Sequence, residues 1–306
     1  MANKNSNLHA AKAAKNDEFY TQLSDIEKEL VHYKEHFRDK VVLCNCNDVI
    51  HGNFAKYFSL NFEFLGLKEL ICTSFNDEEG GHGIACRYHG DLNGNNVPDI
   101  SEWEQMPMHG NGGFNTPEGI ALIQEADIIV TNPPFSLFRE FIGTLMEYNK
   151  KFLIIGNVNA ITYGEVFPFI KDNKIWLGCS LHAIKCSFLV NEDYNSTNTF
   201  IDSDGLKKAK VNNAVWYTNL DHKKRHEKLD LYKHYSPEDN PKYDNYDAIE
   251  VSKTADIPMD YEGAMGVPVT FLDKYCPEQF ELIDALNNPY INEKSIYKRL
   301  IIKPKR

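Results

Sequence analysis

The sequence predicts an α/β protein with a doubly wound, mostly parallel sheet, an antiparallel hairpin at one edge and a separate C-terminal region. The main observation is that short buried strands alternate with amphipathic helical segments over about 120 residues, which is typical of a parallel sheet with helices on both faces. Two later strand-like runs lack a helix between them, and the composition changes after about Leu220. A length of 306 residues suits two domains.

The individual elements follow from the periodicity of apolar residues. Residues 1–16, rich in Asn, Ala and Lys, are expected to form an arm outside the fold. Apolar residues then recur at helical spacing from Leu23 to about His36, and KVVLCN (40–45) is a compact β-branched strand. The same signals predict helices around 54–64, 117–125 and 138–148, and strands at 70–75, 126–131 and 152–157.

The remaining segments are less regular. Residues 184–190 and 214–218 are expected to pair as the antiparallel hairpin at the sheet edge. Residues 76–115, dense in Gly, Asn and acidic residues, are expected to form one long loop, which in a compact domain is usually functional. We place the domain boundary at the change in composition, with residues 1–221 as the first domain and residues 222–306 as the second.

Charge is distributed unevenly between these two parts. The formal net charge of −11 would on its own repel a polyanion. Residues 1–221 hold 19 basic and 29 acidic residues, whereas residues 222–306 hold 14 and 15. Within the second part, residues 222–235 and 294–306 are locally basic, and such clusters either contact phosphates or form solvated surface. A nucleic-acid partner therefore stays open.

Other classes of protein are disfavoured by the composition. The first residues contain no apolar core of a secretory signal and no run of eighteen apolar residues exists, so a cytoplasmic protein without a membrane span is expected. The seven cysteines form no C-x-x-C pair, which predicts reduced, mostly buried thiols. His82, Cys86 and His89 lack a fourth ligand at suitable spacing, and no metal is expected.

The strongest functional signal is ADIIVTNPPFSLF, in which a buried strand runs directly into Asn132, Pro133, Pro134 and Phe135. Open parallel sheets bind ligands outside the carboxyl ends of their strands, so this tetrapeptide is expected to face the site. The two prolines fix φ and exclude helix and strand, which makes a stiff bend. The Asn132 side-chain oxygen and the Pro133 carbonyl would then lie side by side, as two acceptors suited to an exocyclic amino group.

Such a pair of acceptors suits methyl transfer to an aromatic amine. The lone pair of adenine N6 is delocalised into the ring, and two acceptors would bind both N–H hydrogens and direct the lone pair at a methyl donor. Phe135 would stack on the base, and no general base is required because the proton can leave after transfer. A rigid turn without function is the alternative, but an N-P-P-aromatic string occurs by chance in well under about 1% of chains this long.

Further motifs add a resemblance to a known family. They are NDEFYTQ (16–22), VVLCNCND (41–48), GDLNGNNVPD (90–99), ADIIVTNPPFSLFREF (126–141), KFLIIGN (151–157), AVWYTNLDH (214–222) and GVPVTFLDKY (266–275). Together they resemble the EcoRI-type adenine-specific DNA methyltransferases over nearly the whole chain from Asn16. The resemblance implies a Rossmann-like methyltransferase fold and transfer of a methyl group from S-adenosylmethionine to N6 of adenine in a short DNA sequence.

The resemblance also implies roles for individual residues. The catalytic motif that grips the flipped adenine is matched by Asn132, Pro133, Pro134 and Phe135. The motif that contacts the methionine end of the donor is matched by Phe19, Tyr20 and Thr21. Without the resemblance, the same F-Y-T would more simply staple and cap the following helix. Asp91 matches the residue expected near the adenine of the donor.

The loop after the first strand departs from the general methyltransferase pattern, in which a glycine-rich turn lets the backbone approach the methionine moiety closely. Here the loop reads NCNDVIHG, with one late glycine. Asn45 and Asp48 are therefore the expected donor contacts, through polar side chains at the strand end. Asn76 and Asp77 are the candidates to hold the ribose at the end of the second strand.

Three alternatives stay open. Residues 91–102 have the oxygen spacing of a calcium loop, but Asn96 stands where such a loop needs glycine, so a polar loop that caps the donor or touches DNA is favoured. An N-P-P-aromatic motif can also serve an RNA adenine or a glutamine amide, although the basic C-terminal segments favour nucleic acid. A non-catalytic DNA- or nucleotide-binding module is disfavoured by the intact motifs.

The sequence therefore predicts a site-specific DNA adenine-N6 methyltransferase that flips its target base out of the duplex and acts as a monomer. DNA recognition is expected mainly from residues 222–306, with the loop at 93–116 as a second candidate. The expected phosphate contacts, chosen by charge and location, are Lys223, Lys224, Arg225, Lys298 and Arg299. A cognate restriction endonuclease is one expected partner, although the sequence equally allows an orphan or phage-borne enzyme.

Overall fold

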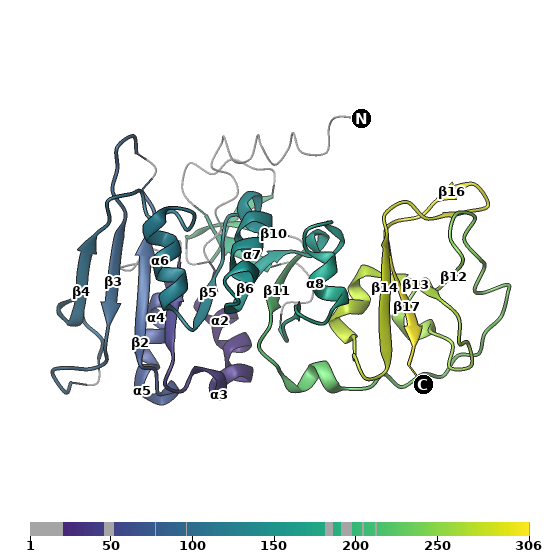
Figure 1. Ribbon diagram of the computed structural model, residues 1–306, viewed down its shortest axis with the longest axis horizontal. Helices are drawn as coiled ribbons and strands as arrows, with labels where there is room; N and C mark the ends of the chain where they lie inside the picture. The colour runs from purple at the N-terminus through teal and green to yellow at the C-terminus, as the bar shows by residue number, and fades with distance from the viewer. Residues whose placement is uncertain are drawn as a thin grey trace.

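The computed structural model describes residues 21–45, 52–76, 78–95, 97–180, 186–190, 198–203, 205–211 and 213–305. Its largest feature is an eight-stranded sheet with the order β4-β3-β2-β1-β5-β6-β11-β7, flanked by helices (Figure 1). Smaller sheets of three, four and two strands accompany it in the described part of the chain. The predicted α/β class with a doubly wound core is confirmed, although the large sheet is parallel only at its centre.

The parallel centre has four strands in the order β2-β1-β5-β6. Their bounds are β2 Glu69–Ser74, β1 Val41–Cys44, β5 Ile128–Thr131 and β6 Lys151–Asn157. Every residue of β1 and β5 is buried, as expected for β-branched runs covered on both faces. Because the four strands run in the same direction, their carboxyl ends meet at one edge of the sheet, called the carboxyl edge below.

Helices cover both faces of this sheet. They are α2 Leu23–Leu30, α3 Lys34–Phe37, α4 Asn53–Leu60, α5 Phe62–Leu65, α6 Pro117–Glu125, α7 Phe138–Glu147 and α8 Phe167–Lys171. Alternate strand residues point to opposite faces, so Leu43 and Ile129 pack with α6 and α7, whereas Val42 and Val130 pack with α2 and α4. None of the helices in the described ranges is long and apolar enough to cross a membrane.

The prediction of one long loop at 76–115 is wrong, because this segment adds two strands to one side of the sheet. β3 (Ile84–Tyr88) pairs antiparallel with β2, and β4 (Trp103–Pro107) pairs antiparallel with β3. These strands were missed because they are short and glycine- and asparagine-rich segments flank them. No residue of β4 is fully buried, so it lacks the apolar alternation that identifies a strand.

The predicted pairing of residues 184–190 with residues 214–218 is also wrong. β11 (Ala214–Thr218) lies antiparallel between β6 and β7 (Trp176–Leu177). Residues 184–190 contribute β8 (Cys186–Leu189) instead to the three-stranded sheet, whose other members are β9 (Thr199–Ile201) and β10 (Lys207–Val211). The hairpin partner of β11 is therefore the short β7, and two residues are too few to give a strand signal in sequence.

The C-terminal part forms a sheet of its own with the order β12-β13-β17-β14. The bounds are β12 Ile249–Glu250, β13 Met265–Pro268, β14 Phe280–Leu286 and β17 Arg299–Pro304, with a hairpin of β15 Tyr290–Ile291 and β16 Lys294–Ser295. Phe271, Phe280 and Ile302 of this part belong to one continuous core with Ile170 and Leu177. The division at residue 221 stays a prediction, because apolar packing crosses it.

The cysteine side chains that the structure describes are reduced and buried, as the sequence predicts. They are buried and free at Cys44, Cys72, Cys86, Cys179 and Cys276.

Candidate active site

The carboxyl edge is held together by polar side chains from three neighbouring strands. Thr131 Oγ1, at the end of β5, donates a hydrogen bond to the backbone oxygen of Asn45, which follows β1. Asn45 Nδ2 donates to Thr73 Oγ1 in β2 at 3.3 Å. All three residues are fully buried. Asn45, predicted to bind the donor, is thus at the expected edge, where its side chain also fixes the ends of β1 and β2.

The N-P-P-F tetrapeptide lies at this same edge. Asn132 follows the last residue of β5, and Pro134 precedes a 3-10 turn, η3 (Phe135–Leu137), that leads into α7. Asn132 Nδ2 donates to Thr21 Oγ1 at 3.2 Å. That bond orients the amide so that its oxygen faces away from Thr21. The predicted stiff bend at the end of a buried strand is therefore present.

Thr21 connects the F-Y-T motif with Asn132. The Thr21 side chain is buried, and its backbone oxygen accepts a hydrogen bond from Asn53 Nδ2 at 2.8 Å. Two segments 111 residues apart in the chain therefore meet through one hydroxyl. Phe19, Tyr20 and Asp48 lie outside the described residues, as does Asp77.

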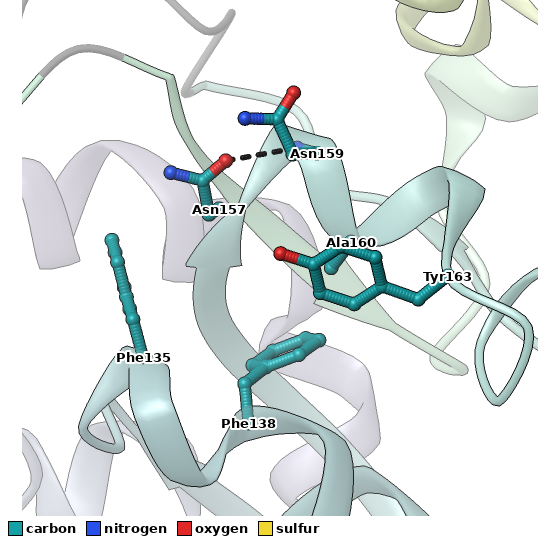
Figure 2. A pocket seen from close by; sticks show the side chains of 6 residues that line it. All are labelled: Phe135, Phe138, Asn157, Asn159, Ala160 and Tyr163. Atoms are coloured by element: carbon teal, nitrogen blue, oxygen red, sulfur yellow. Dashed lines mark hydrogen bonds between the residues drawn. The ribbon is translucent and has the colours of Figure 1, made fainter. Parts of the chain in front are cut away.

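A cavity of about 190 Å³ opens beside the tetrapeptide. Its lining side chains are Phe135, Phe138, Asn157, Asn159, Ala160 and Tyr163. Figure 2 shows Phe135 and Tyr163 on opposite sides of this space, with the two asparagines along a third side. Two aromatic walls and amide groups suit a flat heterocycle with polar edges. None of the six side chains is an acid or a histidine.

The floor of the cavity is closely packed. Phe138 is buried and lies against Tyr217, with ring centroids 4.9 Å apart. The ring of Phe138 also approaches Gly156 so closely that a β-carbon there would lie 2.3 Å from Phe138 Cε2. Tyr217 donates its hydroxyl to the backbone oxygen of Asn157 at 2.8 Å, and burial raises the pKa of Tyr217 well above its ordinary value. The phenol therefore remains a donor, and the wall is rigid.

The far wall is supported by a cation. The Arg139 guanidinium lies over the Tyr163 ring, 4.2 Å from its centroid, and Arg139 Nη1 is 3.7 Å from Glu165 Oε1. Asn157 caps the 3-10 segment η4 (Val158–Thr162), because its side-chain oxygen accepts from Asn159 N at 2.9 Å. Sequence reasoning identified Phe135 but missed the other lining residues, since it gave no role to any of them, although Phe138 and Asn157 lie within quoted motifs. The polar end of KFLIIGN at the carboxyl edge is the signal that could have indicated Asn157.

The glycine-rich segment at 110–113 lies at the same edge beside β2, within the loop at 93–116 that the sequence offered as a second candidate for DNA recognition. Asn76 N donates to Asn111 O at 2.9 Å. Gly112 has φ of +82°, and a β-carbon there would lie 2.3 Å from Ser74 O, so only glycine lets this loop approach the end of β2. Asn76, a candidate for the donor ribose, is therefore held at the carboxyl edge.

Asp91 is placed elsewhere. Because β3 is antiparallel to β2, Tyr88 at its end pairs with Leu70 near the start of β2, and Asp91 follows at the opposite edge of the sheet from Asn132. The expected role of Asp91 near the donor's adenine is not supported by this position. The role of Asp91 was assigned from the resemblance alone, within a segment expected to be one long loop, so the antiparallel direction of β3 was not considered.

The loop at 91–102 satisfies its own oxygens. Asp91 Oδ1 accepts from Gly94 N at 2.7 Å, Glu102 Oε1 accepts from Leu92 N at 2.9 Å, and Asp99 forms a capping box with Glu102. Within the described residues, no group of three or more His, Cys, Asp or Glu side chains could hold a metal ion. The calcium alternative therefore has no support in the arrangement of this loop.

Three of the expected phosphate contacts also lie away from Asn132. β11 runs antiparallel to β6, so residues that follow Thr218 leave from the amino edge, opposite the carboxyl edge. There Lys224 Nζ pairs with Asp273 Oδ1 at 2.7 Å, and the Arg225 guanidinium stacks on Trp176 at 3.9 Å. Lys223 is exposed at the same edge. Lys224 is thus paired within the second part of the chain, and Arg225 packs on a tryptophan of the first.

The other two expected contacts have defined intramolecular partners. Arg299 is 9% exposed, and its Nη2 lies 2.7 Å from Glu250 Oε1. Lys298 Nζ donates to Thr162 Oγ1 at 2.8 Å, on the carboxyl side of β6. Arg299 is therefore an internal ion pair, whereas Lys298 lies near the cavity. A basic run in sequence does not distinguish these two environments.

The fold and the site define a class of protein: a Rossmann-like methyltransferase with an N-P-P-aromatic motif at the end of β5, the third of its four central parallel strands. A family described as "Adenine-specific methyltransferase EcoRI" matches residues 7–305. The chain therefore belongs to the EcoRI family of adenine-specific methyltransferases, as the resemblance predicted.

Similar proteins cover nearly the same length. The chain is 50% identical to Type II methyltransferase M.EcoRI of Escherichia coli, over 98% of this chain and 96% of that protein. It is 39% identical to Type II methyltransferase M.MgeORF184P of Mycoplasma genitalium, over 97% and 91%. It is 40% identical to Type II methyltransferase M.MpnI of Mycoplasma pneumoniae, over 92% and 86%.

Proposed function

We propose that this adenine-specific methyltransferase transfers a methyl group from S-adenosylmethionine to N6 of an adenine flipped out of duplex DNA. The observation that carries the proposal is the position of Asn132-Pro133-Pro134-Phe135, at the carboxyl end of a buried parallel strand and on the wall of an aromatic cavity. A base inside a duplex cannot reach such a cavity, so the enzyme must extrude it, at a cost of a few kcal/mol.

Asn132 and Pro133 would activate the amino group. The Asn132 side-chain oxygen and the Pro133 carbonyl oxygen each accept one N6 hydrogen, which favours a pyramidal nitrogen whose lone pair points at the methyl group. Thr21 supports this role because it binds the amide nitrogen of Asn132 and so sets the direction of the oxygen. The proton leaves N6 after transfer, so a carboxylate or histidine in the cavity is not needed.

The aromatic walls would hold the base in place. Phe135 stacks on one face, and the cavity accepts the ring between Phe135 and Tyr163 (Figure 2). Stacking on an aromatic side chain contributes on the order of 1–3 kcal/mol per base, which offsets much of the cost of unstacking. The packed floor of Phe138 and Gly156 limits the depth to which a base enters.

The carboxyl edge between β1 and β2 would hold the donor. The chemistry that S-adenosylmethionine supplies when bound is a methyl group activated by sulfonium charge. Hydroxyl and amide groups of Thr21, Asn45 and Asn76 converge on this edge from three segments, which suits the amino acid and ribose ends of such a molecule. Phe19, Tyr20 and Asp48 keep their assignment from the resemblance as part of the proposal.

DNA would lie across the carboxyl side of the molecule. Figure 1 places β10 and the β15–β16 hairpin on the same side of the large sheet. Lys210 of β10 and Lys294 of β16 are exposed there, and Lys298 bonds to Thr162 in η4, the segment that carries two of the cavity-lining residues. We therefore propose Lys210, Lys294 and Lys298 as phosphate contacts in place of the residues at the amino edge.

The test is methyl transfer to defined acceptors. The purified protein is incubated with methyl-labelled donor and either duplex DNA, RNA or protein, and we expect label only in DNA, as N6-methyladenine. Asn132→Ala should lower kcat by about 100-fold or more, the effect of removing one acceptor aimed at the reacting group, while thermal unfolding and donor binding stay unchanged. Absence of label in duplex DNA would refute the proposal.

We also propose that a cognate restriction endonuclease acts on the same DNA site as this enzyme. The relatives named above are Type II methyltransferases. Sequencing of methylated DNA from cells that express the enzyme gives its target sequence, and the same DNA should then resist an endonuclease that cuts that sequence. Methylation at many unrelated sequences would argue against such a partner.

A further inference from the structure

The C-terminal part of the chain contacts the wall of the cavity at one place. Tyr297 donates its hydroxyl to Asn159 Oδ1 at 2.9 Å, and Lys298 Nζ donates to Thr162 Oγ1 at 2.8 Å. Asn159 and Thr162 both belong to η4, and Asn159 lines the cavity (Figure 2). Two consecutive residues of the C-terminal part therefore hold the segment that forms one side of the proposed base site.

The position of Tyr297 is itself fixed from behind. Arg299 Nη1 donates to the backbone oxygens of Tyr297 at 3.0 Å and Lys298 at 3.3 Å. The same guanidinium pairs with Glu250, a buried carboxylate that also accepts from the hydroxyl of Tyr243. A buried ion pair thus presents the backbone of residues 297 and 298 to η4, which gives Arg299 a role that its charge alone did not suggest.

The hydrogen bond from Tyr297 determines what Asn159 offers to a ligand. Its Oδ1 is occupied by the Tyr297 hydroxyl, and its backbone N–H is occupied by Asn157 Oδ1 at 2.9 Å. Its Nδ2 forms no hydrogen bond with any residue that the structure describes. The group left for an occupant of the cavity is therefore an amide N–H donor, and ring nitrogens of adenine are acceptors.

We propose that Tyr297 is a positioning residue that turns the Asn159 amide so that Nδ2 donates to a ring nitrogen of the target adenine. The inference rests on the proposed function of the cavity and adds a residue of the C-terminal part to base recognition. Tyr297 is 62% exposed, so its ring contributes little to the core, and among the residues that the structure describes its hydroxyl bonds only to Asn159. Loss of that hydroxyl should therefore affect base recognition more than folding.

The first experiment compares three variants, which remove the Tyr297 hydroxyl, the whole Asn159 amide or only the N–H donor of that amide. Tyr297→Phe removes the hydroxyl alone, Asn159→Ala removes the amide, and Asn159→Asp keeps the acceptor for Tyr297 but removes the donor. We expect each to lower kcat/KM for duplex DNA by about tenfold, the size of one hydrogen bond, with donor affinity unchanged. The Tyr297→Phe and Asn159→Ala effects should not add, because both act through one amide.

The matched control is Tyr232→Phe. Tyr232 is 75% exposed, and its side chain forms no hydrogen bond or ring contact with the part of the chain that the structure describes, so loss of its hydroxyl should leave kcat/KM unchanged. Additive effects of Tyr297→Phe and Asn159→Ala would overturn the proposal. So would wild-type kcat/KM in Asn159→Asp, because a carboxylate cannot donate.

The second experiment identifies the atom on the base. Duplexes carry 1-deazaadenine, 3-deazaadenine or 7-deazaadenine at the target position, and each lacks one ring acceptor. We expect wild-type enzyme to methylate one of the three about tenfold more slowly than adenine. That penalty should disappear in Asn159→Ala and shrink in Tyr297→Phe. A penalty of equal size in wild-type and Asn159→Ala enzyme, or no penalty for any of the three analogues, would refute the contact.

The two proposals fail in different ways. If wild-type enzyme labels no adenine in any duplex, the proposed function is wrong. If it labels unmodified duplex normally and the Tyr297 and Asn159 variants match it, only the role of Tyr297 is wrong.

Discussion

The side chain of Asn132 is bound by the hydroxyl of Thr21, with Nδ2 and Oγ1 3.2 Å apart. The amide of an asparagine can present either its oxygen or its nitrogen to a substrate, and only the oxygen accepts N6 hydrogens. Because the nitrogen is bound by Thr21, the oxygen is left for the proposed substrate, and a residue 111 positions earlier in the chain supports the proposed role of Asn132.

We therefore expect Thr21→Val to impair catalysis without unfolding the protein. Valine matches the shape of threonine but cannot bind the Asn132 amide, so the amide can turn and kcat should fall by about tenfold, the cost of one lost hydrogen bond. Thr21→Ser keeps the hydroxyl and should retain activity. Single-turnover methyl transfer measures both variants. Equal rates for the valine and serine enzymes would show that the hydroxyl does not orient the amide.

Gly156 and Gly143 make a matched pair for testing the floor of the cavity. A β-carbon at Gly156 would lie 2.3 Å from Phe138, which is buried, whereas nothing lies within 4 Å of a β-carbon at Gly143 in α7. We expect Gly156→Ala to destabilise the fold by about 1–3 kcal/mol through overpacking. Gly143→Ala should stabilise it by about 0.5–1 kcal/mol, because alanine favours helix. Urea unfolding measures both, and a neutral Gly156→Ala would mean that Phe138 can move.

At the scale of elements, one arginine of β3 joins the β2–β3 strand pair to α6. Arg87 Nη1 lies 2.6 Å from Glu69 Oε1 in β2 and 2.6 Å from Glu125 Oε1 in α6. Arg87 Nη2 also donates to Glu125 Oε2 at 2.7 Å, so the contact with α6 is bidentate. The hydrogen bonds from Arg87 lower the pKa of Glu125 below its ordinary value.

This pairing predicts a pH dependence of stability. A carboxyl whose pKa is lowered by folding stabilises the protein above its unfolded pKa, about 4.3 for Glu, and that stabilisation is lost as the pH falls through the folded pKa. We expect Arg87→Met to be less stable than wild type at pH 7, with the difference shrinking below about pH 4. Thermal unfolding between pH 3 and 7 measures it. Arg38→Met, at a surface arginine with no ion pair recorded in the described ranges, is the control. A difference independent of pH would show that Arg87 acts by packing alone.

The elements that sequence predicted well are those with strong local signals. β1, β2, β5 and β6 are buried β-branched runs, and the N-P-P-F bend follows one of them, so both their existence and their common edge could be inferred. The strands β3 and β4 could not be inferred, because they are short, glycine- and asparagine-rich segments flank them, and β4 has no buried face. Since β3 is antiparallel to β2, Asp91 lies at the amino edge, away from the donor site that the resemblance implied for it.

At the scale of the whole molecule, the same limit applies to charge. Arg299 and Lys298 are adjacent basic residues, yet one is a buried ion pair with Glu250 and the other lies near the cavity. The run at 222–235 was favoured by its charge, but β11 delivers it to the amino edge. The net charge of −11 and its uneven distribution can be read from the sequence, whereas the arrangement of strands decides which cations can face DNA.

The positions of three exposed lysines lead to a prediction about DNA binding. Lys210 and Lys294 are exposed on the carboxyl side, and Lys223 is exposed at the amino edge. Each phosphate contact contributes about 0.9 to the slope of log K against log salt concentration. We expect Lys210→Ala and Lys294→Ala each to reduce that slope by about 0.9 and to weaken DNA binding at all sequences. Lys223→Ala, which removes an equal charge, should leave the slope unchanged. Fluorescence anisotropy with a labelled duplex over a series of salt concentrations measures all three. If Lys223→Ala lowers the slope and the other two do not, DNA binds the amino edge, and the flipped base would then have no path to Asn132.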